Sequence, residues 1–195
     1  MSTTLSMAAF ALAASISPGP VNIVALSSGA QHGLRASMAH VTGATVGFTV
    51  LLVLIGLGLH ELTTWLPWLV TAIQWAGVAF LLFMAWKLAT DDGRLGDGSA
   101  SKRPSLLYGA AMQWLNPKAW LAAIAGMGAY AAGGDVAQVG EFGAIYFVIC
   151  YVSIACWAYA GAFLRHYLQD ARRMRWLNRG LAALLVASAV YLLVG

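Results

Sequence analysis

The sequence predicts an all-α integral membrane protein with six transmembrane helices, arranged as a 3+3 inverted repeat. Of its 195 residues, 61% are hydrophobic and only 9% are charged, and the mean hydropathy is +0.75. A helix needs about 20 apolar residues to cross the hydrocarbon core of a bilayer. Apolar runs of that length fill almost the whole chain and leave only short connections, so we expect no soluble domain.

We expect the spans near residues 5–29, 37–59, 66–87, 106–131, 142–164 and 177–194. Each should be helical, because a helix satisfies its own backbone hydrogen bonds in lipid. No Lys or Arg precedes Arg35, so the first span lacks the basic start of a cleaved signal peptide and is expected to remain. Cys150 and Cys156 are six residues apart on one predicted helix, on different faces, which argues against a disulfide or a shared metal ion.

The whole chain, 1–195, is predicted to form a single transmembrane domain built from two repeats. Residues 90–104 are rich in Gly, Ser and Asp and have no apolar periodicity, which is typical of a flexible linker. This cytoplasmic linker separates a first repeat of about 1–89 from a second repeat of about 105–195. Because three spans is an odd number, the second repeat enters the membrane from the opposite side.

The basic residues predict the orientation. Every Lys and Arg except Lys118 lies at or in the connections between spans one and two, three and four, or five and six. The other connections hold Glu61, Asp135 and Glu141 and no basic residue, so the positive-inside rule places both termini outside. The cluster Arg165 to Arg179 is predicted to lie at the cytoplasmic interface and to attract anionic lipids. So short a cluster beside the membrane is not expected to bind nucleic acid.

Proline-containing motifs interrupt the first and fourth spans near their centres. The motifs are Ser17-Pro18-Gly19-Pro20-Val21-Asn22 and Asn116-Pro117-Lys118. Proline removes a backbone donor and clashes with the preceding turn, so both helices are predicted to be broken at mid-membrane. Pro20 and Pro117 suit the first position of a new half-helix, with Ser17 and Asn116 available as capping residues.

These breaks predict a binding site for a carboxylate. The start of a helix presents unpaired N–H groups and a partial positive charge, and Lys118 adds a full positive charge beside one of them. The expected substrate-binding residues are Ser17, Pro18, Gly19, Pro20, Asn22, Asn116, Pro117 and Lys118. No Asp or Glu lies inside a predicted span, which disfavours a cationic substrate side chain. Proton coupling would use Lys118 or His40, although a packed or interfacial role is favoured for His40.

Small residues recur at every fourth position of the second span, at Ala39, Gly43 and Gly47, and Gly29 and Gly33 precede them. Such a stripe lets two helices approach closely. It is consistent with packing inside one chain and equally with the seam of a homodimer.

Taken together, these motifs resemble the LysE/RhtB family of amino-acid exporters over nearly the whole chain. The resemblance rests on Ser17-Pro18-Gly19-Pro20, on the glycine-spaced stretch from Gly29 to Gly47, and on Asn116-Pro117-Lys118-Ala119. It implies a bacterial inner-membrane carrier that exports amino acids or related solutes by using the proton motive force, and it points to the same proline motifs as the site. Many members have an acidic residue just after the second-span glycine, where this chain has Phe48.

The leading functional hypothesis is therefore a secondary exporter of a small neutral amino acid, with no cofactor and no enzymatic activity. A cation or heavy-metal exporter would need ligands facing the pathway, and the interior offers little besides Cys150 and Cys156. An intramembrane hydrolase would need a deep Ser and His pair, whereas the histidines all lie near predicted span edges. A non-transporting scaffold would leave Lys118 unexplained.

Overall fold

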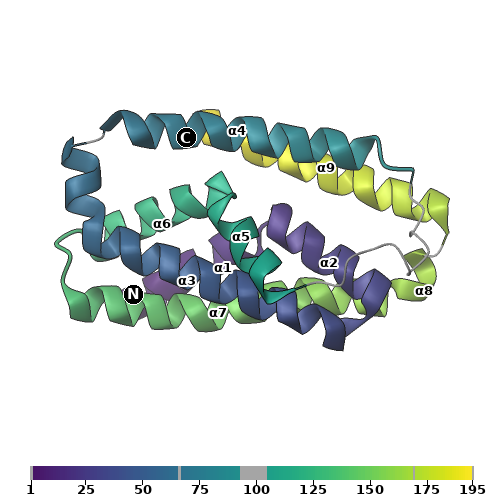
Figure 1. Ribbon diagram of the computed structural model, residues 1–195, viewed down its shortest axis with the longest axis horizontal. Helices are drawn as coiled ribbons and strands as arrows, with labels where there is room; N and C mark the ends of the chain where they lie inside the picture. The colour runs from purple at the N-terminus through teal and green to yellow at the C-terminus, as the bar shows by residue number, and fades with distance from the viewer. Residues whose placement is uncertain (1, 66, 93–104, 169, 195) are drawn as a thin grey trace.

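The computed structural model describes residues 2–65, 67–92, 105–168 and 170–194 (Figure 1). These residues form helices joined by short connections and contain no strand. The helices are α1 (Thr3–Ile16), α2 (Pro20–His32), α3 (Leu34–Trp65), α4 (Pro67–Ala89), α5 (Leu106–Trp114), α6 (Pro117–Tyr130), α7 (Val136–Phe163), α8 (Arg165–Leu168) and α9 (Ala171–Val194). The all-helical class is therefore confirmed. Residues 93–104 of the predicted linker lie outside the described residues.

The helices match the predicted spans closely, and two acidic residues lie differently from the prediction. α3 continues to Trp65 and α7 begins at Val136, so Glu61 and Glu141 belong to helices and not to connections. α7 starts early because Asp135 caps it, accepting hydrogen bonds from the backbone N–H groups of Ala137 at 2.7 Å and Gln138 at 3.1 Å.

Several helices are suited to a membrane. Among the described residues, Leu34–Gly58 and Val136–Phe163 are each long and apolar enough to cross a bilayer. α1 and α2 would form a third span if they are taken together across a bend of 61°. The count of six spans and their inverted arrangement remain predictions.

Helices from one half of the chain pack mainly against helices from the other half. α1 and α2 pack against α7, α5 and α6 pack against α3, and α4 pairs with α9. The main core joins the first two of these groups and includes Ala11, Leu52 and Phe142. A second cluster joins α2 to the pair formed by α4 and α9, which runs along one side of the molecule (Figure 1).

Glycines make the closest helix contacts possible. A Cβ atom added to Gly29 of α2 would lie 2.0 Å from the carbonyl oxygen of Ala158, and one added to Gly161 of α7 would lie 1.9 Å from that of Leu26. These separations are far below van der Waals contact, so the backbones of α2 and α7 touch directly.

The small-residue stripe of α3 is used in the same way, against α5. A Cβ atom on Gly43 would lie 1.9 Å from the carbonyl oxygen of Leu106, and one on Gly47 would lie 2.7 Å from Cα of Ala110. Ala39 is exposed and does not share this contact. Gly33 instead forms the turn between α2 and α3, with a φ of 81°. The stripe is therefore an internal packing surface, and a homodimer, which remains a prediction, would need another face.

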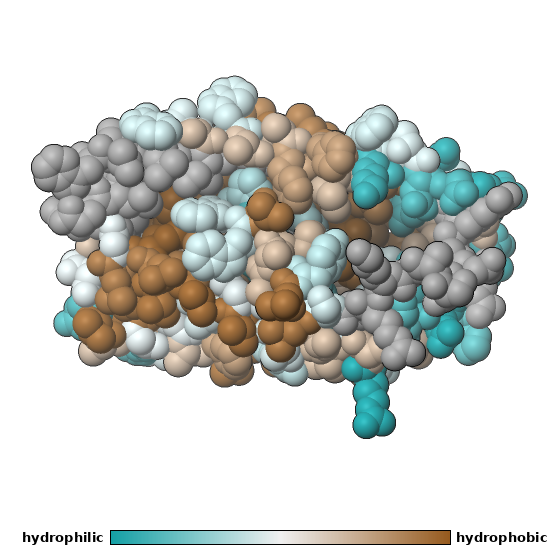
Figure 2. Space-filling model, viewed as in Figure 1, coloured by the Kyte–Doolittle hydropathy of each residue, from teal (hydrophilic) through white to brown (hydrophobic). Residues whose placement is uncertain are grey.

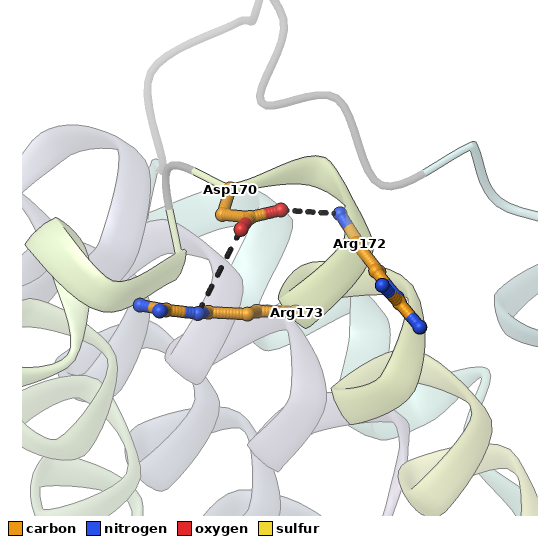
Figure 3. A network of polar contacts seen from close by, with 3 residues as sticks. All are labelled: Asp170, Arg172 and Arg173. Carbon is orange, nitrogen blue, oxygen red and sulfur yellow. Dashed lines mark hydrogen bonds and ion pairs between the residues drawn. The ribbon is translucent and has the colours of Figure 1, made fainter.

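Charged residues gather at one end of the molecule. α8 and the first turns of α9 carry exposed arginines, and Figure 2 shows hydrophilic side chains at this end and hydrophobic ones over the middle. Asp170 precedes α9 and lies between two arginines (Figure 3): its carboxylate accepts from the backbone N–H of Arg172 at 2.8 Å and pairs with Arg173 Nε at 3.7 Å. Both chain ends lie in the opposite half of the molecule (Figure 1).

The glycine contacts predict opposite effects for the same substitution at two positions of α3. We expect Gly43→Ala to lower the melting temperature in detergent, because the added methyl group meets the backbone of α5 and overpacking costs about 1–3 kcal/mol. Gly58→Ala is the control, since nothing lies within 4 Å of its added Cβ and alanine favours helix by about 1 kcal/mol. Equal melting temperatures for the two variants would contradict the α3–α5 contact.

Candidate functional site

The first helix break separates α1 from α2 and is stabilised by one side chain. Ser17 and Gly19 have extended backbones, with φ and ψ of −62° and 140° for Ser17 and −160° and 170° for Gly19, and Pro20 is the first residue of α2. Asn22 then donates from Nδ2 to the carbonyl oxygens of Ser15 at 2.9 Å and Ser17 at 2.8 Å. Its amide replaces backbone donors that a continuous helix would have supplied, so the break is satisfied within the protein.

The prediction that Ser17 caps the second half-helix is wrong. With Pro20 as the first helical residue, the capping position falls on Gly19, which has no side chain to accept a hydrogen bond. Ser17 is instead the C-cap residue of α1. Its hydroxyl donates a hydrogen bond back to the carbonyl oxygen of Ala14 at 3.1 Å.

The second break separates α5 from α6 and follows the prediction more closely. Asn116 caps α6 by accepting a hydrogen bond from the backbone N–H of Lys118 at 3.2 Å, and Pro117 is the first helical residue. Trp120 returns across the break and donates from Nε1 to the carbonyl oxygen of Trp114 at 2.9 Å. The last turn of α5 therefore also finds a donor in the protein.

Lys118 connects the two breaks. Its Nζ donates to the Ser17 hydroxyl at 2.7 Å, to the Ser17 carbonyl oxygen at 3.1 Å and to the Pro18 carbonyl oxygen at 3.1 Å. These acceptors occupy the three donors of the ammonium group. A motif on α6 and a motif 100 residues earlier in the chain thus meet at one partly buried cation.

A small cavity of about 40 Å³ lies beside this contact. Four of the predicted site residues line it, namely Gly19, Asn22, Asn116 and Lys118, whereas Ser17, Pro18, Pro20 and Pro117 do not. A water molecule needs roughly 10–15 Å³ of such volume, so the cavity has room for about two or three.

Other polar residues of the cavity wall were not predicted. Ser15, Gln113, Tyr146 and Cys150 line it together with apolar residues that include Phe48. Gln113 is only 6% exposed, and its amide makes no hydrogen bond to the described part of the chain. The available signal was proximity to the breaks, since Ser15 precedes Pro18 by three residues and Gln113 precedes Asn116 by three. Of the two cysteines, Cys150 is buried against the cavity and Cys156 is exposed.

A larger cavity of about 670 Å³ lies between α1, α6 and α9. Its wall is mostly apolar, with Phe10 and Leu184 among its residues, and its polar side chains are Ser17, Lys118 and Ser188. Lys118 therefore borders both cavities.

His40 does not line the small cavity, although Val21, which it contacts, does. Its side chain is fully buried, its Nε2 lies 3.3 Å from the carbonyl oxygen of Val21, and its ring lies 6.1 Å from that of Tyr108. The favoured interpretation, a packed histidine, agrees with this position. Within the described ranges, no three His, Cys, Asp or Glu side chains are grouped to hold a metal ion.

An apolar helical bundle in which two helix breaks meet around a partly buried lysine, next to a small cavity with polar groups in its wall, is the arrangement of a membrane transporter. Comparison with known proteins gives the same class: the family model of the LysE type translocators matches residues 12–195. The chain belongs to this family, as its motifs predicted, and it is a transporter and not an enzyme.

Its relatives include proteins named for amino-acid efflux. The chain is 33% identical over 194 residues to the cysteine/O-acetylserine efflux protein of Escherichia coli strain K12, a match that covers 93% of this chain and 92% of the relative. The proteins of the same name from Shigella sonnei strain Ss046 and Shigella flexneri are 33% and 32% identical over the same shares. No solved structure matches the chain.

The hydrogen bonds of Asn22 predict a stability effect. Asn22→Ala leaves the Ser15 carbonyl oxygen without its side-chain donor and removes one of the two donors to the Ser17 carbonyl oxygen, so we expect unfolding to become easier by about 1–3 kcal/mol. The measurement is the melting temperature in detergent. Ser188→Ala is the control, because its exposed hydroxyl only donates to a carbonyl of its own helix, at 2.9 Å. An Asn22→Ala protein as stable as the control would contradict the role given to Asn22.

Proposed function

We propose that the protein is a secondary active exporter of a small neutral amino acid or its derivative across the bacterial inner membrane, driven by the proton motive force. The observation that carries this proposal is the Lys118 ammonium group, which is bound by the broken end of α1 and faces a polar cavity. Membership of the translocator family and the names of the relatives, which state cysteine and O-acetylserine efflux, support an amino acid as the substrate.

The substrate carboxylate binds at the starts of α2 and α6. Those helix starts favour an anion, and a carboxylate adds charge–charge attraction to the hydrogen bonds that the Lys118 ammonium group makes to neutral oxygens. The substrate carboxylate would therefore replace the Ser17 and Pro18 oxygens as the acceptor of the Lys118 hydrogen bonds. The residues of this site are Ser17, Pro18, Gly19, Pro20, Asn22, Asn116, Pro117 and Lys118. Gln113 offers an amide oxygen to the substrate's ammonium group in the same cavity.

The lining of the cavity favours a neutral substrate side chain. No Asp or Glu is among the described residues that line it, and Phe48 occupies the position where many family members have an acid. Since a cationic side chain would be buried there without a counter-charge, its binding would be costly.

Transport requires the small cavity to open. Its volume of about 40 Å³ is too small for an amino acid, so α1 and α6 must separate from the helices opposite them. The extended residues Ser17 to Gly19 provide a hinge, and the cavity beside α9 gives α1 and α6 space to move.

The six-span inverted repeat with both termini outside is part of this proposal. The packing supports it, because the broken pair of each half lies on the long helix of the other half and α4 lies on α9, as a two-fold pseudo-symmetry requires. The arginines of α8 and α9 gather at one end and both termini lie in the other half, which favours a cytoplasmic arginine end that attracts anionic lipids.

Loss of the Lys118 charge should abolish transport. In inside-out vesicles we expect Lys118→Met to reduce the uptake of labelled cysteine or serine about 10- to 100-fold, because a buried hydrogen bond to a charged group contributes about 1.5–3 kcal/mol. Lys87→Met is the matched control, since Lys87 is exposed near the end of α4. Undiminished uptake by Lys118→Met, in protein that inserts normally, would refute the carboxylate site.

Proton coupling gives a separate prediction. A protonophore should prevent uptake against a concentration gradient, because it dissipates the proton motive force that we propose as the driving force. Two basic groups are considered for coupling, namely the partly buried Lys118 and the buried His40. We assign the coupled proton to Lys118 and expect His40→Gln to retain driven uptake, since Lys118 lines the cavity and His40 does not. Loss of driven uptake in His40→Gln with substrate binding intact would instead assign coupling to His40.

A further inference from the structure

The small cavity has a second polar surface that the carboxylate does not occupy. It is formed by Ser15 of α1 with Tyr146 and Cys150 of α7, which we call the side-chain face. Tyr146 and Cys150 are four residues apart and so lie on one side of α7. Their neighbours in the wall are apolar, with Phe48 and Ile154 among them, and the rings of Phe48 and Tyr146 are 4.6 Å apart.

Ser15 has a hydroxyl that the protein leaves unsatisfied. The residue is 8% exposed, and its Oγ makes no hydrogen bond of good geometry to any described residue. Ser15 lines the same cavity as Tyr146 and Cys150, so the three side chains form one polar surface. Buried polar groups are nearly always hydrogen-bonded, and the exceptions call for a ligand or another explanation.

The break in α1 fixes the position of this hydroxyl. The backbone carbonyl of Ser15 accepts a hydrogen bond from Asn22 at 2.9 Å, and the same Asn22 amide binds Ser17, which holds Lys118. Ser15 and Lys118 are therefore both attached to the break between α1 and α2, and both line the same cavity. A substrate whose carboxylate is held at Lys118 would direct its remaining groups to the other walls.

We propose that the side-chain face selects the exported amino acid by its side chain, favouring a short uncharged side chain with a hydroxyl, a thiol or an ester oxygen over an aliphatic one of equal size. This inference rests on the proposed function, because it requires the carboxylate at Lys118. The physical reason is that an aliphatic side chain would leave the buried hydroxyl and thiol unpaired, and sites built to hydrogen-bond a substrate group reject analogues that lack it.

Competing substrates of similar shape test the inference. Serine and cysteine differ from 2-aminobutyrate mainly by a hydroxyl or a thiol in place of a methyl group. In inside-out vesicles we expect the wild-type protein to prefer serine or cysteine over 2-aminobutyrate by about tenfold in kcat/KM, and Ser15→Ala and Cys150→Ala to remove most of that preference. Cys150→Ser should retain it, because the hydroxyl keeps a polar group at that position.

Cys156→Ala is the matched control, since Cys156 is exposed on the same helix, and it should leave the preference unchanged. If Ser15→Ala and Cys150→Ala lower the uptake of all three amino acids equally, the inference is wrong although the proposed function stands. If the wild-type protein takes up none of them, and Lys118→Met behaves as wild type, the proposed function itself fails.

Alkylation of Cys150 provides a second measurement that does not depend on transport. In Cys156→Ala protein, Cys150 is the only remaining cysteine, so a small thiol reagent reports on the cavity. Serine should slow the modification several-fold more than 2-aminobutyrate at equal concentration. Equal protection by the two amino acids, or protection by neither, would overturn the role of this face.

Discussion

The hydrogen bonds from Lys118 to the end of α1 are the interaction on which the site depends. A broken helix leaves carbonyl groups without donors, and a lysine inside a membrane bundle is a charge without a partner. Each of these features would be costly alone. Together they satisfy each other, because the ammonium group binds the Ser17 and Pro18 oxygens that the break exposes. The same contact holds a cation at the junction of two helix starts.

The rest of the bundle keeps these two breaks together. At their far ends α1 and α6 are joined again, where the Tyr130 hydroxyl lies 2.8 Å from the Ser6 hydroxyl and donates to the Ser6 carbonyl oxygen at 3.1 Å. The other halves of the broken helices, α2 and α5, are held by direct backbone contacts, through Gly29 and Gly161 between α2 and α7 and through Gly43 between α3 and α5. Side chains larger than hydrogen at these glycines would push the helices, and with them the two breaks, apart.

Much of this could be predicted from local sequence. The proline motifs located both breaks, and Asn116 was correctly expected to cap α6, because capping depends on residues within one turn. Ser17 was expected to do the same for α2 and does not, because Pro20 fixes the helix start and leaves Gly19 at the capping position. The sequence also indicated Lys118 as the cation within a span but not its partners, since those are the Ser17 hydroxyl and two backbone oxygens about 100 residues away.

The helical class, the positions of the helices, both breaks and the family were determined by the sequence, because apolar length and proline act locally and do not depend on the rest of the fold. The tertiary structure decided which groups face one another. It placed Ser15, Tyr146 and Cys150 on a wall beside Lys118 and turned the glycine stripe of α3 inward against α5. These contacts depend on how helices that are distant in the sequence pack against one another. Because a membrane helix is hydrophobic on nearly every side, its residue pattern does not reveal which side contacts a neighbouring helix.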